Sequence, residues 1–196
     1  KKSSYNYISF LPGSRENEVN KLFKYFDKIE NYIYKKNINL KIFIPTLPHL
    51  NDLIIKKTAN WRVETVISND IDKFDIFYDD VFISVTCSGT ASLEIAKRNI
   101  PQIVIYKLNF FSEFILRFFV KIRFACILNI ISKKMIIPEV VNSQLTNKKL
   151  LSTFQKLFTN EDFRKKQIDN VNFYLPMIES NKSPYVISAK RIESLI

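Results

Sequence analysis

The stretch VFISVTCSGTASLE, from Val81 to Glu94, decides the fold of this 196-residue chain. Its first part, Val81 to Val85, is apolar enough for a buried strand, and a helix begins near Thr90 after a tight turn that contains Gly89. The chain has only 2 glycines, far fewer than the roughly 7% of an average protein. Because glycine allows a positive φ and lets the backbone approach a ligand closely, a glycine at this junction indicates a functional turn.

The other glycine, Gly13, lies in the turn Phe10-Leu11-Pro12-Gly13-Ser14-Arg15, which also follows a strand candidate and precedes a helix candidate. Helix N-termini after such turns present N–H groups and a partial positive charge to anions. We therefore predict that the two glycine turns face each other across one phosphate site.

Strand and helix candidates alternate through the first half of the chain, and several strands are apolar without clean alternation, as in a sheet covered on both faces. This pattern predicts an α/β fold with a doubly wound parallel sheet, whose ligands bind beyond the carboxyl ends of the strands. The expected strands are 5–11, 40–44, 61–67, 81–85 and 102–106, and the expected helices are 16–36, 51–57, 71–78 and 90–98.

The second half is expected to be mostly helical. Residues 127–142 are interpreted as loop, strand and loop, and helices are predicted over 147–158, 162–174 and 184–195. We expect residues 1–145 to form the sheet domain, and 146–196 to form helices that pack on it or are exchanged with a partner in a homodimer. The chain opens with Lys-Lys-Ser-Ser and no Met, so we expect a fragment or a cut domain.

The segment Asn109 to Phe124, NFFSEFILRFFVKIRF, is nearly all aromatic and aliphatic, with Glu113, Arg117 and Lys121 on one narrow stripe. It is too short and too charged to span a bilayer. Its pattern suits an interfacial helix in peripheral contact with a membrane, and the alternative is a core or dimer-interface helix.

The formal net charge of +11 suits an anionic partner, such as nucleic acid, an anionic membrane or a phosphorylated substrate. The alternative is a solvated lysine-rich surface. The scattered basic residues lack an aromatic–glycine stacking signature, which disfavours nucleic acid. Cys87, Cys126 and His49 match no zinc, disulfide or other metal framework.

Several side chains near the glycine turns could bind a nucleotide. Arg15 could bind a phosphate in a bidentate manner through its guanidinium, or be a surface arginine paired with Glu18. Ser88, Gly89 and Thr90 offer hydroxyl and N–H groups, although they would also serve as an ordinary helix cap. Glu94, one turn into the helix, could accept both hydroxyls of a ribose, or simply favour the helix dipole.

Five motifs in order and spacing resemble the C-terminal half of the lipid-A-disaccharide synthase family. They are Leu11 to Arg15, Ser88 to Glu94, Pro101 to Tyr106, Leu128-Asn129 and Pro138-Glu139. The sequence departs from the family pattern at Leu128, where proline is usual, at Lys133-Lys134, where Gly-Arg is usual, and at Asn142, where glutamine is usual.

The resemblance implies the C-terminal donor domain of a GT-B glycosyltransferase. The family moves a diacylglucosamine unit from UDP-diacylglucosamine to diacylglucosamine 1-phosphate, with inversion and without a metal or a cofactor beyond its UDP-sugar donor. It implies a cytoplasmic enzyme, peripheral on the inner face of the membrane through residues 109–124. The N-terminal half, which would hold the acceptor site and a base, is absent, so this chain should bind the donor without turnover.

The resemblance also implies residue roles. The residues implied to bind the diphosphate are Arg15, Gly13, Ser14 and the Ser88 to Thr90 turn. Glu94 would bind the ribose, and Asn129 and Glu139 would line the donor pocket. Arg15 and Asn129 would be catalytic. The alternatives are another GT-B UDP-sugar enzyme, such as an N-acetylglucosaminyltransferase or a UDP-sugar 2-epimerase, and a non-catalytic basic binding module.

Overall fold

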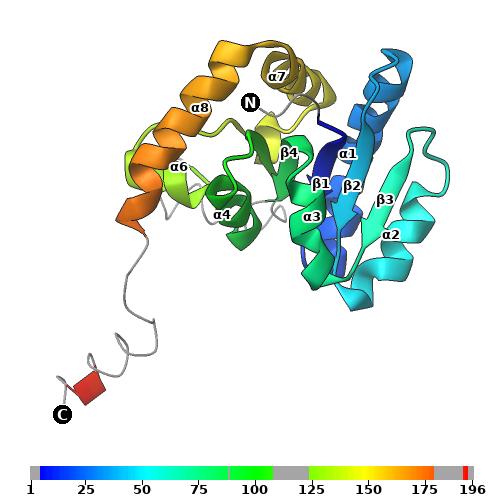
Figure 1. The fold of residues 1–196 in the computed structure, drawn as a ribbon, viewed down its shortest axis with the longest axis horizontal. Helices are drawn as coiled ribbons and strands as arrows, with labels where there is room; N and C mark the ends of the chain where they lie inside the picture. Colours follow the sequence, from blue (N-terminus) through cyan, green and yellow to red (C-terminus); the bar gives the residue numbers. More distant parts are fainter. Residues whose placement is uncertain (1–4, 88, 108–123, 179–191, 194–196) are drawn as a thin grey trace.

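The fold is built on one parallel sheet. A computed structural model describes residues 5–87, 89–107, 124–178 and 192–193. Within these residues six strands pair in the order β3-β2-β1-β4-β5-β6, all parallel (Figure 1). The strands are β1 (Tyr7–Leu11), β2 (Lys41–Pro45), β3 (Thr65–Ser68), β4 (Val81–Cys87), β5 (Gln102–Tyr106) and β6 (Glu139–Val141). The predicted doubly wound parallel sheet is confirmed.

The strand order contains a switch point between β1 and β4. The chain builds outward from β1 to β3, then crosses back and continues outward from β4 on the other side. Leu11, the last residue of β1, pairs with Thr86 near the end of β4. The two strands therefore end at the same edge of the sheet, and the turns that follow them emerge side by side.

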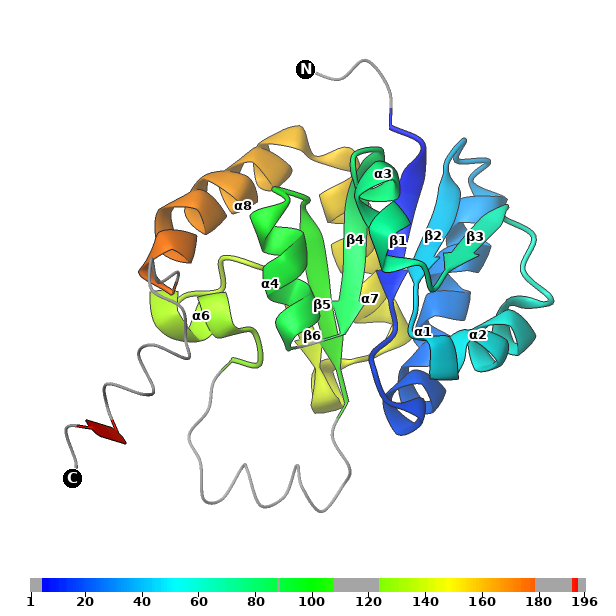
Figure 2. The same ribbon diagram turned by 60° about the horizontal axis from the view of Figure 1, so that its bottom comes forward.

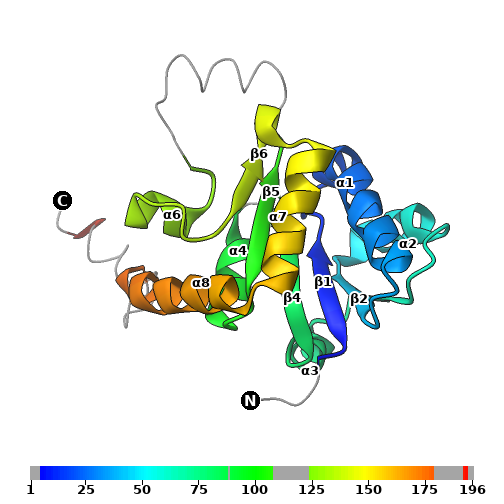
Figure 3. The same cartoon turned by 90° about the horizontal axis from the view of Figure 1, so that it is seen from above.

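Helices cover both faces of the sheet (Figures 2 and 3). Side chains of α1, α2 and α7 share one buried cluster with the strands, and those of α3, α4, α6 and α8 join two clusters on the other face. The helices are α1 (Glu16–Lys35), α2 (Asn51–Thr58), α3 (Phe74–Tyr78), α4 (Thr90–Lys97), α6 (Ile127–Ser132), α7 (Asn147–Thr159) and α8 (Glu161–Tyr174). Short 3₁₀ turns are η1 (Pro48–Leu50), η2 (Ile71–Lys73), η3 (Asn142–Gln144) and η4 (Leu175–Met177).

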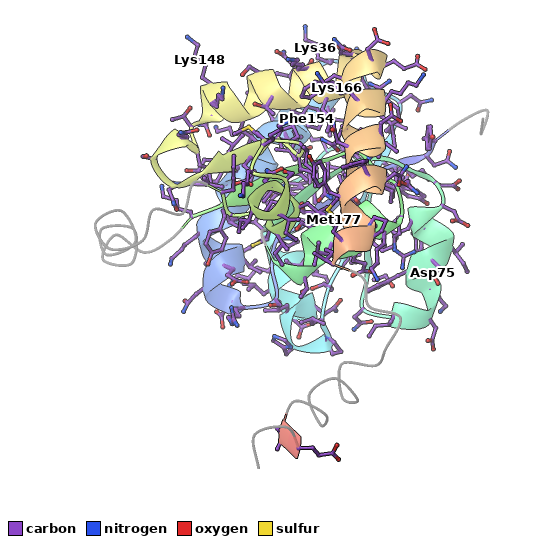
Figure 4. All side chains as sticks on the ribbon, turned by 90° about the vertical axis from the view of Figure 1, so that its left-hand side faces the viewer. Lys36, Asp75, Lys148, Phe154, Lys166 and Met177 are labelled. Carbon is purple, nitrogen blue, oxygen red and sulfur yellow. The ribbon has the colours of Figure 1, made fainter. Side chains whose placement is uncertain are left out.

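The long helix α1 forms because its apolar residues recur every three or four positions. Val19, Leu22, Phe26, Ile29 and Ile33 are all buried against the sheet. The C-terminal helix α7 adds Leu150, Phe154 and Leu157 to the same cluster, and Figure 4 shows Phe154 pointing inward from α7. The described part of the C-terminal helices thus packs on the sheet.

Helix α8 is fixed to the sheet by a pair of glutamines. The Gln102 backbone N–H donates to Gln167 Oε1 at 2.6 Å, and Gln167 Nε2 donates to the Gln102 carbonyl at 3.0 Å. The Gln102 side chain continues inward, since its Oε1 accepts from the Thr86 hydroxyl at 2.8 Å and its Nε2 donates to the Ser92 carbonyl at 2.8 Å. This buried network links β4, β5, α4 and α8 next to the switch point.

Two parts of the structure differ from the sequence prediction. The strand expected from Trp61 begins only at Thr65, because Glu30 of α1 accepts the N–H groups of Arg62 and Val63 and so withdraws them from the sheet. The segment expected to be loop before the last strand contains α6 instead. The predicted segments at 109–123 and 183–196 lie outside the described residues, apart from 192–193.

Candidate functional site

A cavity of about 440 Å³ lies at the carboxyl ends of β1, β2 and β4. Both glycine turns contribute to its lining, and the loop after β2 and residues of α3 complete it. The lining residues are Leu11, Gly13, Ser14, Arg15, Glu18, Pro45, Thr46, Leu47, Phe74, Tyr78, Cys87, Gly89, Thr90, Ala91 and Glu94. The structure therefore brings both glycines to one cavity at the switch point.

Both glycines have backbone conformations that side chains rarely adopt. Gly13 has φ +120°, and Gly89, the residue before α4, has φ +116° and ψ −148°. A Cβ atom at Gly13 would lie 2.8 Å from Glu18 Oε2, whereas a Cβ at Gly89 would meet nothing within 4 Å. At position 13 glycine is thus required both by the positive φ and by the lack of room for a Cβ atom. At position 89 only the positive φ requires glycine, because the space beside it is open.

Arg15 ends the first turn and starts α1. Its guanidinium is largely exposed, and its Nη1 donates to Glu18 Oε1 at 3.0 Å. The backbone N–H of Ser14 donates to the other carboxylate oxygen, Oε2, at 3.2 Å. The Ser14 carbonyl lies 3.3 Å from His49 Nε2. The structure therefore shows the Glu18 pairing considered as the alternative for Arg15, and shows it inside the cavity lining.

Glu94 lies on the α4 side of the cavity and is about half exposed. Its Oε1 is 3.5 Å from Arg98 Nη2, and the same nitrogen is 2.6 Å from Asp75 Oδ1 on α3. The Arg98 guanidinium lies over the Tyr78 ring, 4.5 Å from its centre. Burial, with the nearby Glu94 charge, raises the pKa of the Tyr78 phenol above its ordinary value, so this cavity wall stays neutral.

Asn129 and Glu139 are not among the residues that line this cavity. Asn129 Nδ2 donates to Ile137 O at 2.7 Å and to Glu139 Oε1 at 2.5 Å, and Asn129 Oδ1 accepts from the backbone N–H groups of Ile136 and Ile137, each at 2.9 Å. These contacts use every hydrogen-bonding position of the amide. The Asn129 side-chain amide is thus fully hydrogen-bonded within the protein.

Glu139 completes this group, which we call the Asn129–Glu139 cluster. Its Oε2 accepts from the Ala125 N–H at 2.7 Å and its Oε1 from the Cys126 N–H at 2.9 Å. Both side chains are buried. The cluster ties the start of α6 to the segment before β6. It also reaches the second glycine turn through Cys126, whose Sγ lies 3.9 Å from Ser92 Oγ, the hydroxyl that donates to the Gly89 carbonyl at 2.8 Å.

Some predicted features fall on residues that the structure does not describe. Ser88 and nearly all of the proposed membrane segment 109–124 are in this group, whereas Phe124 is described and buried. No helix in the described ranges has the length and apolar character needed to cross a bilayer. In the same ranges no three His, Cys, Asp or Glu side chains gather as a metal site would require.

Two contributors to the cavity were not expected from the sequence. The loop Pro45 to Leu47 was overlooked, although the rule that parallel strands end at one edge would have predicted its place. Tyr78 was assigned to a weak helix, with no signal for its inward position. Tyr106, at the end of β5, does not line the cavity; burial, with Glu18 and Cys87 nearby, raises the pKa of its phenol.

Solved structures share this fold. The chain aligns with a protein described as a UDP-N-acetylglucosamine 2-epimerase from Listeria monocytogenes with a TM-score of 0.59 and 16% identity, covering 88% of this chain and 41% of that one. It aligns with Acinetobacter baumannii MurG with a TM-score of 0.56 and 13% identity, covering 91% and 50%. At such low identity the likeness establishes the fold, which is one Rossmann-like half of the GT-B architecture.

The family follows from the sequence matches. A family model for lipid-A-disaccharide synthetase matches residues 2–186, and the chain belongs to this family. A lipid-A-disaccharide synthase of Rhodospirillum centenum is 27% identical over 84% of this chain and 41% of its own length, and that of Wigglesworthia glossinidia brevipalpis is 31% identical over 81% and 42%. The chain thus spans about two fifths of the length of these relatives.

Proposed function

We propose that this chain is the donor-binding half of a lipid-A-disaccharide synthase and holds the UDP of a UDP-diacylglucosamine donor. The observation that carries the proposal is the meeting of both glycine turns in one cavity at the switch point. That cavity offers the Ser14 N–H, the Arg15 guanidinium and the start of α4 to a single ligand. These are the groups that bind a diphosphate in the absence of a metal.

The proposed positions of the UDP follow from the chemistry of the lining. The diphosphate lies between Gly13 and Gly89, next to the open space beside Gly89. The Glu94 carboxylate, on the α4 side of the same cavity, accepts the ribose hydroxyls. When the glycosidic bond breaks, negative charge develops on the departing diphosphate, and Arg15 with the helix N–H groups stabilises that charge.

The remaining parts of the reaction belong outside this cavity. We infer that a second Rossmann-like half supplies the diacylglucosamine 1-phosphate acceptor site and the base, with inversion at the sugar carbon. Residues 109–124 would then hold the enzyme against the membrane where its acylated substrates reside. On this basis the chain alone binds the donor and does not turn it over.

The direct test is calorimetric titration of the chain with UDP. We expect saturable binding that Arg15→Ala weakens by roughly 10- to 100-fold, the value of one hydrogen bond to a charged group. Lys166→Ala, on the exposed surface of α8 (Figure 4), removes the same charge far from the cavity and should leave the affinity unchanged. Absence of binding at millimolar UDP would contradict the proposal.

A competition experiment separates this donor from simpler ones. UDP-diacylglucosamine should displace bound UDP more effectively than UDP-N-acetylglucosamine does, because its acyl chains add apolar contacts. Equal or weaker displacement would favour another UDP-sugar enzyme of the GT-B architecture.

A further inference from the structure

The Glu18 carboxylate lies among the groups that the proposed function assigns to the diphosphate. Its Oε1 accepts from Arg15 Nη1 at 3.0 Å and its Oε2 accepts from the Ser14 N–H at 3.2 Å. Only about a fifth of the side chain is exposed, and Glu18 lines the cavity together with both glycines. One carboxylate thus accepts from the Arg15 Nη1 group and from the Ser14 N–H at once, while the other N–H groups of the Arg15 guanidinium do not contact it.

The position of this carboxylate is close to the backbone that a phosphate would approach. Glu18 Oε2 lies 2.8 Å from the point where a Cβ on Gly13 would be. The space left open by the missing side chain of Gly13 is therefore occupied by an oxygen atom with negative charge. A phosphate oxygen that bound to the Ser14 N–H would take the same place.

We propose that Glu18 is an internal anion that occupies the first half of the phosphate site and that the diphosphate must displace. The inference rests on the proposed function, because it concerns the same cavity. Displacement exchanges two hydrogen bonds of Glu18 for two of the ligand, so the hydrogen bonds nearly balance. The remaining negative charge of Glu18, a few ångströms from the diphosphate, opposes binding.

The role of Glu18 differs from that of a helix cap alone. Glu18 is the third residue of α1, a place where a carboxylate commonly reaches back to the N-terminal N–H groups. In this chain the same carboxylate also accepts a hydrogen bond from the Arg15 guanidinium. The α1 N-terminus is thus stabilised by Glu18 without ligand, and an incoming diphosphate takes over both donors.

The experiment compares Glu18→Gln with Glu16→Gln by calorimetric titration with UDP. Both changes remove one negative charge from the first turn of α1, but Glu16 is exposed and is not in the cavity lining. The glutamine at position 18 keeps the shape and an acceptor oxygen while losing the charge. We expect Glu18→Gln to tighten UDP binding by about 5-fold or more, the effect of one unit charge at about 4 Å in water, and Glu16→Gln to change it less than 2-fold.

Inorganic pyrophosphate, titrated in the same way, should show the same order, because the effect concerns the phosphates and not the uridine. If the original chain binds UDP and Glu18→Gln binds it equally or more weakly, Glu18 instead positions Arg15 and the inference is overturned while the donor-site proposal stands. If none of the three proteins binds UDP, the proposed function fails and the inference fails with it.

Discussion

The glycine-turn cavity and the Asn129–Glu139 cluster are built from similar polar groups but use them in opposite ways. In the cavity, Arg15 is largely exposed and Gly89 has open space beside it. In the cluster, Asn129 makes four hydrogen bonds and Glu139 accepts three, and both side chains are buried. Polar groups left accessible can serve a ligand, whereas groups fully satisfied inside the protein stabilise its fold.

The largest expected effect lies in the cluster. Glu139→Ala leaves the N–H groups of Ala125 and Cys126 and the Asn129 amide without their acceptor. The loss of three hydrogen bonds to one carboxylate, two of them fully buried, should lower the free energy of unfolding by about 3 kcal/mol or more. Urea unfolding measures this loss. The control is Glu94→Ala, which removes a half-exposed carboxylate from the cavity wall. If the two variants lost equal stability, the proposed difference between the cavity and the Asn129–Glu139 cluster would be wrong.

A smaller effect is expected at the second glycine turn. Gly89→Ala forces a side chain onto a backbone with φ +116° and ψ −148°, a region populated almost only by glycine. Because a Cβ there meets no other atom within 4 Å, the cost is backbone strain alone, about 1–3 kcal/mol in the free energy of unfolding. Thermal unfolding checks it, and an unchanged midpoint would show that this turn relaxes at no cost.

The pH dependence of stability offers a third comparison. Burial raises the pKa of the Cys126 thiol in the cluster, and Glu139 nearby adds to the shift. A raised pKa in the fold means that the thiol contributes its full stability below its unfolded pKa, near 8.5, and loses it as the pH rises through the folded value. Above about pH 8.5, the free energy of unfolding of the original chain should therefore fall more steeply with pH than that of Cys126→Ala. The difference in slope is at most about 1.4 kcal/mol per pH unit. Parallel curves from pH 7 to 10 would contradict this.

The sequence predicted the cavity better than the cluster, for a physical reason. A scarce glycine between an apolar strand and an amphipathic helix is a local signal, and the parallel sheet then brings the two turns together at its carboxyl edge. Asn129 and Glu139 gave no such signal, because their roles depend on where α6 packs. The short apolar run 127–132 fits a strand or a helix equally well, and the loop expected at its start is a helix in the structure.

Glu18 marks another limit of prediction from sequence. Its spacing from Arg15 suggested an ion pair, and the structure contains that pair. Its second contact, with the Ser14 N–H, depends on the φ of +120° at Gly13, a conformation that spacing alone does not specify. That Glu18 caps α1 with the same groups proposed to bind the phosphate follows only from the three-dimensional structure of the turn.

The smallest expected effect on stability is at the residue with the largest expected effect on binding. Arg15 is largely exposed and forms an ion pair across three positions of α1, an arrangement that contributes less than about 0.5 kcal/mol in most proteins. Arg15→Ala should therefore unfold in urea almost as the original chain does, while its affinity for UDP falls. A loss of stability as large as that of Glu139→Ala would mean that Arg15 holds the first turn in shape. The weaker UDP binding of Arg15→Ala would then result from a distorted cavity and not from a missing phosphate contact. Urea unfolding and UDP affinity of this one variant together decide whether Arg15 binds the ligand or stabilises the turn.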